Sequence, residues 1–282
     1  MKKTILITGS KGFTGRTLVN MLNKKNFKVL ALDCDISKKK QLQDALKDVS
    51  PEYVVHLAAI SNVEHYDVSI INKVNIEGTR NLLSIINNMV NLPKLVVIPS
   101  SAYVYGVPKS GILNENSKLD PLNAYGKSKL EMENLCEDFQ NLSILITRPF
   151  NYTGSDQELS FLIPKIIHHF KLKRKDIELG NLNVKREFND VRDVCEIYIK
   201  FIENVNFSDK INICSGKSHS ICEVIKICER LTGHIINIKV NQNLKRTSEI
   251  SNIIGDPKKM NAMIGDHVFY NLEDTLKSML FN

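Results

Sequence analysis

The chain begins with a glycine-rich segment placed between two patterns of different period. Residues 8–15 read TGSKGFTG, after the apolar run Thr4 to Thr8 and before a helical pattern, Phe13 to Lys25. Glycines at the three positions permit a tight turn, a close backbone approach to a ligand and close packing of the helix on the strand. Backbone N–H groups at a helix start attract anions. The segment therefore predicts a strand–turn–helix unit that binds a pyrophosphate.

Short β-rich runs alternate with helical patterns through residues 1–150. The expected strands are Thr4 to Thr8, Lys28 to Leu32, Tyr53 to Leu57, Leu95 to Ile98 and Leu142 to Thr147. Continuous apolar strands separated by helices are typical of a parallel sheet covered on both faces. We therefore predict an α/β fold with a Rossmann-type, doubly wound parallel sheet as a dinucleotide-binding domain over 1–150.

The regular alternation of strands and helices ends at Asn151. Beyond it, the expected strands are shorter and farther apart in the sequence. Strands are expected near 176–179, 211–214 and 235–240, with helices near 161–170, 191–203, 220–232 and 272–280. This pattern predicts a smaller α/β C-terminal lobe over 151–282. We expect this lobe to bind the substrate and to interleave with the first domain near 186–204.

Two charged residues give opposite indications about the cofactor. Asp33 closes the second expected strand, where a carboxylate accepts hydrogen bonds from ribose hydroxyls and favours NAD. Lys11 lies inside the glycine-rich segment and could attract the 2′-phosphate of NADP. Asp35 is a second carboxylate that could take the adenosine-facing role. The choice between NADH and NADPH stays open.

A second motif, AYGKSK, places Tyr125 and Lys129 four residues apart. Residues with this spacing share one face of a helix. A lysine beside a phenol is expected to lower the phenol pKa from about 10, so that the tyrosine can exchange a proton. Ser101, in PSSAYVYG after another strand, could hydrogen-bond the oxygen that exchanges that proton.

These segments together resemble a known family. TGSKGFTG, HLAA (56–59), SSAYVYG and Tyr125-x-x-x-Lys129 occur in the order found in extended short-chain dehydrogenases/reductases, the NAD-dependent epimerase/dehydratase family that acts on nucleotide sugars. The resemblance implies Ser101, Tyr125 and Lys129 as catalytic residues. It also matches Asn75, in VNIEGT, to a helix asparagine that supports the lysine through water.

The resemblance implies two sets of binding residues and no metal. The residues expected around the NAD(P)H cofactor are Gly9, Lys11, Gly12, Phe13, Gly15, Asp33, Asp35, Ile36, Leu57, Ala58, Ala59, Asn75, Tyr125, Lys129 and Pro149. Those expected around the substrate are Ser61, Ser101, Ala102, Tyr103, Tyr125, Asn151, Arg186, Arg246 and Glu249.

The second half resembles one branch of the family, the GDP-4-dehydro-6-deoxy-mannose reductases. RPFNYTG, LGNLNVKREFNDVRDV and RTSEISNIIGDPKKM carry this likeness, and in that branch Asn151, Arg186 and Arg246 match positions that bind the substrate diphosphate. The implied activity is NAD(P)H-dependent reduction of the C4 keto group of a 4-keto-6-deoxy nucleotide sugar, in deoxysugar and surface-polysaccharide biosynthesis.

Three alternatives stay open at this point. One is a nucleotide-sugar 4-epimerase that retains NAD. Another is a reductase of dTDP- or CDP-4-keto-6-deoxyglucose, and a third is a non-catalytic nucleotide-binding protein. A 4,6-dehydratase is disfavoured because Ala102 and Tyr103 stand where dehydratases carry two acids, and neither side chain is an acid or base near neutral pH.

Charge and cysteine usage limit the partners. The net charge is +7, but the basic residues are scattered, which argues against nucleic acid. The six cysteines form no C-x-x-C pair, which gives no support for a zinc site. No segment reaches the ~18 apolar residues of a membrane span. We expect a cytoplasmic protein, and the resemblance implies a homodimer.

Overall fold

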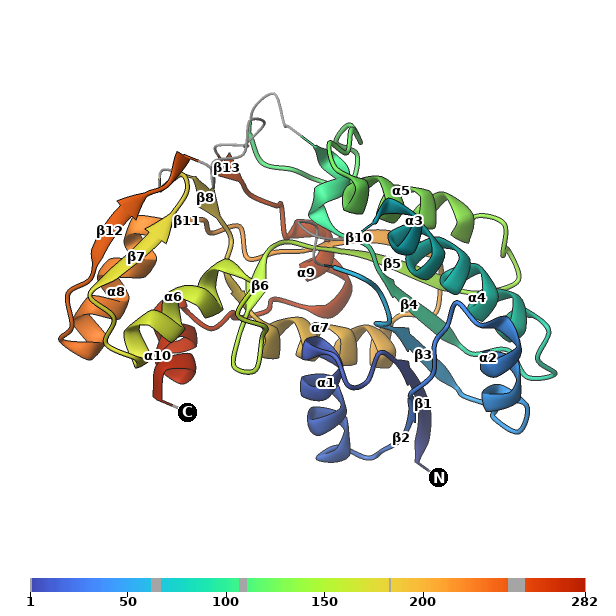
Figure 1. The fold of residues 1–282 in the computed structure, drawn as a ribbon. Coiled ribbons are helices and arrows are strands. Elements are labelled where there is room, and N and C mark those ends of the chain that lie inside the picture. The colour runs from blue at the N-terminus through green and yellow to red at the C-terminus, as the bar shows by residue number, and fades with distance from the viewer. Residues whose placement is uncertain (1, 62–66, 107–110, 183, 243–251, 282) are drawn as a thin grey trace.

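The computed structural model describes residues 2–61, 67–106, 111–182, 184–242 and 252–281 (Figure 1). Its main feature is a parallel sheet in the order β10-β5-β4-β3-β1-β2. The strands are β1 (Lys3–Thr8), β2 (Phe27–Leu32), β3 (Tyr53–His56), β4 (Leu95–Pro99), β5 (Ile144–Pro149) and β10 (Asp209–Ile213). The strand order reverses between β1 and β3, so the crevice for a ligand opens at their carboxyl ends.

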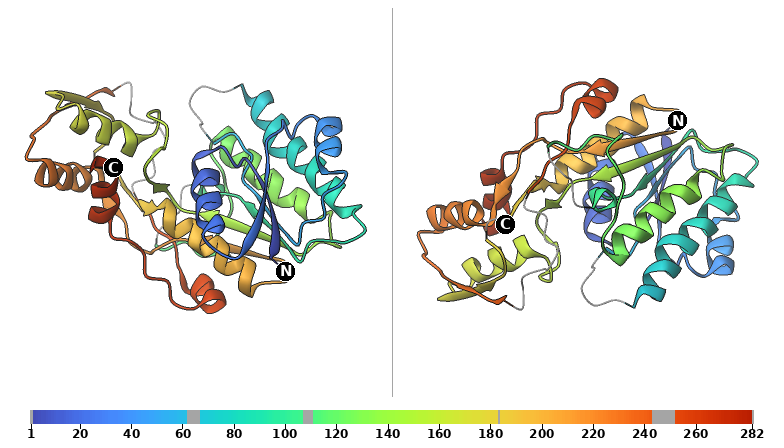
Figure 2. Two further views of the ribbon diagram at one scale, coloured as in Figure 1. Left: turned by 90° about the horizontal axis from the view of Figure 1, so that it is seen from below. Right: turned by 90° about the horizontal axis from the view of Figure 1, so that it is seen from above.

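Helices cover both faces of this sheet (Figure 2). On one face lie α1 (Phe13–Asn23) and α7 (Val191–Asn204). On the other lie α2 (Lys39–Leu46), α4 (Thr79–Asn87) and α5 (Ala124–Cys136). Ile5 and Ile7 pack toward the first face and Leu6 toward the second, because successive side chains of a strand point to opposite sides. The prediction of a doubly wound Rossmann-type sheet is confirmed.

One strand lies elsewhere than expected. The pattern predicts that the strand near 211–214 lies in the C-terminal lobe, but β10 is the edge strand of the large sheet, with Ile211 paired to Thr147 of β5. The preceding helix, α7, packs on α1 and so returns the chain to the sheet. The sequence indicates interleaving near 186–204, but a short strand such as β10 carries no sign of which sheet it joins.

The helical segment between β3 and β4 is interrupted. It consists of α3 (Val68–Asn72), a π-helical turn η1 (Lys73–Gly78) and α4. Gly78 allows the close approach of Ile36, since a Cβ at this position would lie 2.7 Å from the Ile36 side chain. Single π-helical turns occur often at functional sites, and this one carries Asn75.

The C-terminal part has its own apolar core. Helices α6 (Leu162–Lys171), α8 (Ile221–Thr232) and α10 (Leu272–Phe281) pack around the parallel strands β7 (Asp176–Leu179) and β12 (Asn237–Val240). The remaining elements are short: η2 (Ala102–Tyr105), β6 (Tyr152–Thr153), β8 (Lys185–Arg186), β9 (Asn189–Asp190), β11 (His219–Ser220), β13 (Asn252–Ile253) and α9 (Lys258–Ile264). The division at residue 150 into cofactor and substrate parts stays a prediction.

Among the described residues, no helix combines the length and apolar character needed to cross a membrane.

Candidate active site

The glycine-rich segment forms the expected turn between β1 and α1. Gly9 has a φ of +65°, and a Cβ there would lie 2.6 Å from the backbone N of Ala58. A Cβ at Gly15 would collide with the backbone of Gly9 and Ser10. The N-terminus of α1 has no side-chain cap and no acidic residue in its first turn. The free backbone N–H groups at the start of α1 can donate hydrogen bonds to a pyrophosphate. The lack of side chains at Gly9 and Gly15 lets the backbone form the tight turn that presents these groups.

A buried hydrogen-bonded chain holds this turn against β3 and α4. The Thr8 hydroxyl accepts from Ala58 N (3.1 Å) and lies 2.7 Å from Nδ1 of His56. Nε2 of His56 lies 2.9 Å from the Thr79 hydroxyl, which itself donates to Asn75 O. Every hydrogen bond in this series has one donor and one acceptor when the imidazole is neutral and carries its proton on Nε2. Burial favours this state, since it lowers the pKa of His56 to about 3.

Lys11 and Asp33 meet at the end of β2. Nζ of Lys11 donates to Oδ2 of Asp33, and both side chains are mostly exposed, at 78% and 61%. The two residues that gave opposite indications about the cofactor therefore form one ion pair. Asp35 is engaged differently, because its carboxylate accepts from the backbone N and hydroxyl of Ser37, and these bonds lower its pKa.

Other candidate cofactor residues lie at the same edge of the sheet. Leu57, Ala58 and Ala59 directly follow β3, beside the turn at Gly9. Pro149 is the last residue of β5, and Ile36 is buried. The Phe13 ring stacks on Tyr152 with centroids 6.0 Å apart. Tyr152 also shares a hydrogen bond with Thr14 (2.9 Å), so α1 is tied to the segment that follows β5.

Ser101 begins the 3₁₀ turn η2 directly after β4. Its Oγ accepts from the backbone N of Tyr103 (3.2 Å), so the serine hydroxyl hydrogen remains available to another acceptor. Ser101 is nearly buried, with 7% of its surface exposed. The Tyr103 ring lies edge-on to Tyr125, with centroids 6.0 Å apart. Ala102 is buried beside them.

Tyr125 and Lys129 lie on α5, as the spacing predicts. Nζ of Lys129 donates to the carbonyl of Pro99 at the end of β4 (2.7 Å). The pKa of Tyr125 is raised, chiefly by burial, while hydrogen bonding with Ser101 lowers it. The expectation that Lys129 lowers this pKa is wrong for the structure as it stands, because the lysine is directed to Pro99 and the desolvation of the phenol dominates.

Asn75 contacts α5 directly. Its side chain exchanges two hydrogen bonds with the backbone of Ile60 (2.8 and 3.1 Å) and donates to the hydroxyl of Ser128 (3.1 Å). Ser128 in turn donates to Tyr125 O (2.8 Å). The π-helical turn therefore braces the segment after β3 against α5, one residue from Lys129.

The candidate substrate residues are only partly described. The backbone O of Asn151 accepts from Asn189 N (3.0 Å), which brings the segment after β5 beside the segment after β8. Arg186 is half-buried on β8, where its guanidinium donates to Lys185 O (2.8 Å). Ser61 is exposed after β3. Arg246 and Glu249 lie outside the described residues.

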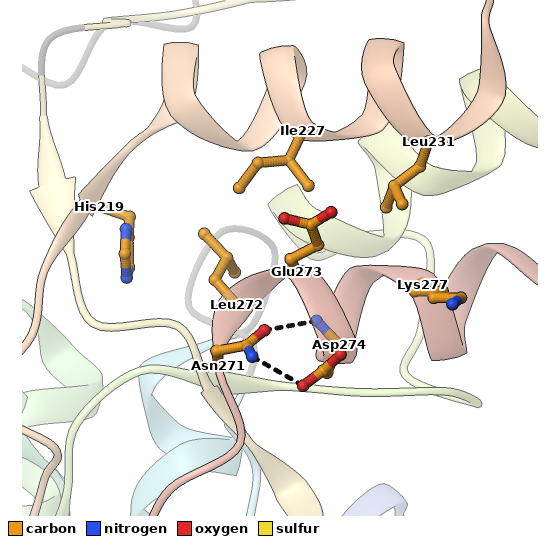
Figure 3. A pocket seen from close by; sticks show the side chains of 8 residues that line it. All are labelled: His219, Ile227, Leu231, Asn271, Leu272, Glu273, Asp274 and Lys277. Atoms are coloured by element: carbon orange, nitrogen blue, oxygen red, sulfur yellow. Dashed lines mark hydrogen bonds between the residues drawn. The ribbon is translucent and has the colours of Figure 1, made fainter.

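A separate hollow of about 330 Å³ lies between α8 and α10 (Figure 3). Its lining residues are His219, Ile227, Leu231, Asn271, Leu272, Glu273, Asp274 and Lys277. Asn271 and Asp274 exchange hydrogen bonds of 2.7 and 2.8 Å that complete the start of α10. None of the candidate catalytic residues lines this hollow, and two of its polar groups, Asn271 and Asp274, serve the helix end.

Several residues near the candidate site carry no signal of their own in the sequence, although most of them lie within the quoted segments. They include Thr8, Ser128 and Tyr152, and also Glu133, Arg148 and Glu187, which are buried charged groups. The sequence offers one signal for Glu133, which continues the four-residue spacing of Tyr125 and Lys129 along α5. Glu187 and Arg148 are revealed only by their burial.

Two curated relatives match nearly the whole chain. The GDP-6-deoxy-D-talose 4-dehydrogenase of Aggregatibacter actinomycetemcomitans is 34% identical, covering 99% of this chain and 97% of its own. The GDP-6-deoxy-D-mannose reductase of Pseudomonas aeruginosa is 26% identical with the same coverage. The structure of RMD from Pseudomonas aeruginosa complexed with NADPH superposes with a TM-score of 0.89 at 25% identity, covering 99% and 97% of the two chains.

The family model described as NAD dependent epimerase/dehydratase family matches residues 5–214. This range spans the glycine-rich turn, Ser101, Tyr125 and Lys129. The family match confirms the expectation of a nicotinamide dinucleotide as the cofactor. It leaves open whether the cofactor is NADH or NADPH. With most of its length matched by that model, the chain belongs to the NAD-dependent epimerase/dehydratase family.

Proposed function

We propose that the protein reduces the C4 keto group of a GDP-linked 4-keto-6-deoxyhexose with NAD(P)H. The observation that carries the proposal is the convergence of Ser101, Tyr125 and Lys129 from η2 and α5 at the edge of the sheet where the glycine-rich turn lies. The two curated relatives, which are named for oxidoreduction of GDP-6-deoxyhexoses, support the substrate class. The higher identity to the first favours a 6-deoxy-talose product.

The residues of the chain fit each part of this chemistry. The free amides of α1 and the turn at Gly9 would hold the pyrophosphate, and Lys129 would hold the nicotinamide ribose. When bound, the reduced nicotinamide supplies a hydride. Ser101 would donate a hydrogen bond to the C4 oxygen and orient it. Tyr125, kept protonated by its raised pKa, would give its proton to the same oxygen and regain one from solvent.

The surroundings of the catalytic tyrosine argue against elimination of water. Ala102 and Tyr103 follow Ser101, and neither offers a carboxylate. The Tyr103 ring packs edge-on against Tyr125 instead. The substrate would thus already carry its keto group on arrival, formed by a dehydration step at another enzyme.

A coupled assay tests the proposal. A separate dehydratase converts GDP-mannose to its 4-keto-6-deoxy form, the protein is added with NADPH or NADH, and absorbance of the reduced nicotinamide is followed. We expect one reduced nicotinamide consumed for each 4-hydroxy sugar formed. NMR of the product then distinguishes 6-deoxy-talose from its C4 epimer.

Two results would contradict the proposal. Interconversion of two 4-hydroxy nucleotide sugars without added cofactor would indicate the 4-epimerase alternative. Reduction of dTDP- or CDP-4-keto-6-deoxyglucose with no activity on the GDP sugar would leave the chemistry in place and overturn the nucleotide assignment.

A further inference from the structure

A buried ion pair lies beneath the catalytic helix. Arg148 on β5 and Glu133 on α5 expose 1% and 0% of their side chains. The pair is bidentate, with Nε of Arg148 donating to Oε1 of Glu133 (2.9 Å) and a terminal nitrogen donating to Oε2 (2.6 Å). Such fork-to-fork contacts fix orientation as well as distance. The proposed reaction uses neither of these two charges.

The other side of the guanidinium reaches the turn that carries Ser101. A second terminal nitrogen of Arg148 donates to the Tyr105 hydroxyl (3.0 Å) and to Glu115 O (3.2 Å). Tyr105 is the last residue of η2, the turn that Ser101 caps, and its hydroxyl donates to Asn212 of β10 (2.6 Å). One buried guanidinium thus joins the two elements that carry the candidate catalytic residues.

Glu133 also continues the catalytic face of α5. Tyr125, Lys129 and Glu133 follow one another at intervals of four residues and therefore share one side of the helix. The Lys129 ammonium is held at Pro99 of β4, and the Glu133 carboxylate is held at Arg148 of the adjacent β5. The helix is therefore fixed over the sheet at two points one turn apart.

The charges around Lys129 come from several elements. Glu133 and Cys136 lie on α5 itself, His56 faces it from β3, and Arg148 lies behind Glu133 on β5. Burial lowers the pKa of Lys129 to about 8, and the negative charge of Glu133 opposes that decrease. His56 is neutral in its hydrogen-bonded chain, and the Cys136 thiol is neutral too because burial raises its pKa to about 12, so the negative charge that favours the ammonium form is that of Glu133.

We propose that Glu133 and Arg148 are positioning residues that fix α5 and η2 relative to one another, and that Glu133 keeps Lys129 charged by offsetting the positive charge of Arg148. This inference rests on the proposed function, which assigns Lys129 and Tyr125 their catalytic roles. The ion pair acts through them and touches neither substrate nor cofactor.

The electrostatic part can be tested without substrate. Titration of ¹³Cε-lysine-labelled protein by NMR, with Lys129 assigned from a K129R variant, measures the pKa of Lys129. E133Q leaves the permanently charged guanidinium without its partner. We expect the Lys129 pKa to fall by about one unit or more, in the range seen when a close opposite charge is lost. E133Q/R148M removes both charges and should bring it back toward the wild-type value.

Controls separate this effect from a general loss of structure. E137Q, at the exposed ion pair with Lys210 just beyond the end of α5, should leave the Lys129 pKa unchanged. An unchanged Lys129 pKa in folded E133Q would overturn the proposal, as would an equal decrease in E133Q and in the double variant, since a merely structural role predicts no reversal.

The positioning part is tested by E133D, which keeps the charge but shortens the side chain and cannot span the same two contacts. We expect kcat to fall roughly 10-fold or more, because small misplacements of catalytic groups are costly, with KM and the Lys129 pKa close to wild type. An unchanged kcat in E133D would overturn the positioning role of the ion pair. This test does not depend on whether E133Q folds. A wild-type protein that reduces no GDP-4-keto sugar would refute the proposed function but leave the NMR test standing.

Discussion

Tyr125 is the residue on which the proposed chemistry depends. Replacing it with phenylalanine removes only the hydroxyl, so Y125F should lose roughly 10²–10⁴-fold in kcat, the usual contribution of a general acid. NADPH affinity, measured by fluorescence titration, should stay close to wild type, because the glycine-rich turn is untouched.

The neighbouring Tyr103 provides a matched control for that variant. Its ring packs against Tyr125 at 6.0 Å, so Y103F changes a nearby phenol and keeps the ring contact. We expect Y103F to retain most of the activity. Near-wild-type turnover by Y125F, or an equal loss in both variants, would refute the assignment of the proton donor to Tyr125.

The Lys11–Asp33 ion pair predicts coupled effects on cofactor preference. D33A should raise the NADPH/NADH ratio of kcat/KM, because it removes a like charge near the 2′-phosphate and frees Lys11. K11A should lower that ratio. Because the two side chains contact each other, the double variant should depart from the sum of the single effects.

Steady-state kinetics with both cofactors on the four proteins measures this coupling. K118A breaks the equally exposed Lys118–Asp120 ion pair and should leave the ratio unchanged. Strictly additive effects of K11A and D33A would mean that the pair is not formed in solution.

At the scale of elements, the hydrogen-bonded chain through His56 joins β1, β3 and α4 and predicts a pH dependence of stability. The pKa of His56 is about 3 in the folded protein and about 6.5 in an unfolded chain. Below pH 6.5 the unfolded state therefore binds a proton that the folded state does not, and stability falls as pH decreases toward 3. Between pH 7 and pH 5 this costs roughly 2 kcal/mol, at about 1.4 kcal/mol per unit.

Urea denaturation of wild type and H56Q at both pH values isolates that contribution. Glutamine cannot take up the proton, so the variant should be destabilised at pH 7 but lose about 2 kcal/mol less than wild type on going to pH 5. H168Q, at a partly exposed histidine of α6, should follow the wild type. Parallel loss in wild type and H56Q would contradict a neutral buried imidazole.

At the scale of the whole molecule, Glu187 connects segments far apart in the chain. Its buried carboxylate accepts from Gly255 N (2.8 Å), Ser215 N (2.7 Å), Ser215 Oγ (3.1 Å) and Asn189 Nδ2 (3.0 Å). It thereby holds the strand with Arg186 against the segments after β10 and β13. Burial raises its pKa, while these four hydrogen bonds oppose the increase.

E187A leaves buried amides without an acceptor, each at a cost of about 1–3 kcal/mol, so unfolding free energy should fall by about 2–5 kcal/mol. E273A removes the exposed ion pair with Arg230 and should change stability by less than about 1 kcal/mol. Urea denaturation of both variants makes the comparison. Equal effects would mean that Glu187 does not anchor the C-terminal part.

The oligomeric state also belongs to this scale. A homodimer stays a prediction, and sedimentation at micromolar concentration would give twice the chain mass of 32.0 kDa if it holds.

The sequence by itself determined the family, the parallel sheet and the candidate catalytic residues. Each of these features depends on residues that are close together in the sequence. The glycine-rich turn is formed by consecutive residues, and the spacing of Tyr125 and Lys129 places them on one face of a single helix. The expected boundaries of β1, β7 and α7 lie within one or two residues of those observed, because apolar periodicity is a local property.

The tertiary structure decided what depends on contacts between distant segments. The apolar pattern of the strand near 211–214 does not reveal which sheet it joins, and packing of α7 on α1 delivers it to β5. The π-helical turn at Asn75 breaks a helix whose sequence shows no interruption. The pKa of Tyr125 rises rather than falls because desolvation depends on everything packed around the ring. Glu133 with Arg148, and Lys11 with Asp33, are pairs that only the folded chain brings into contact.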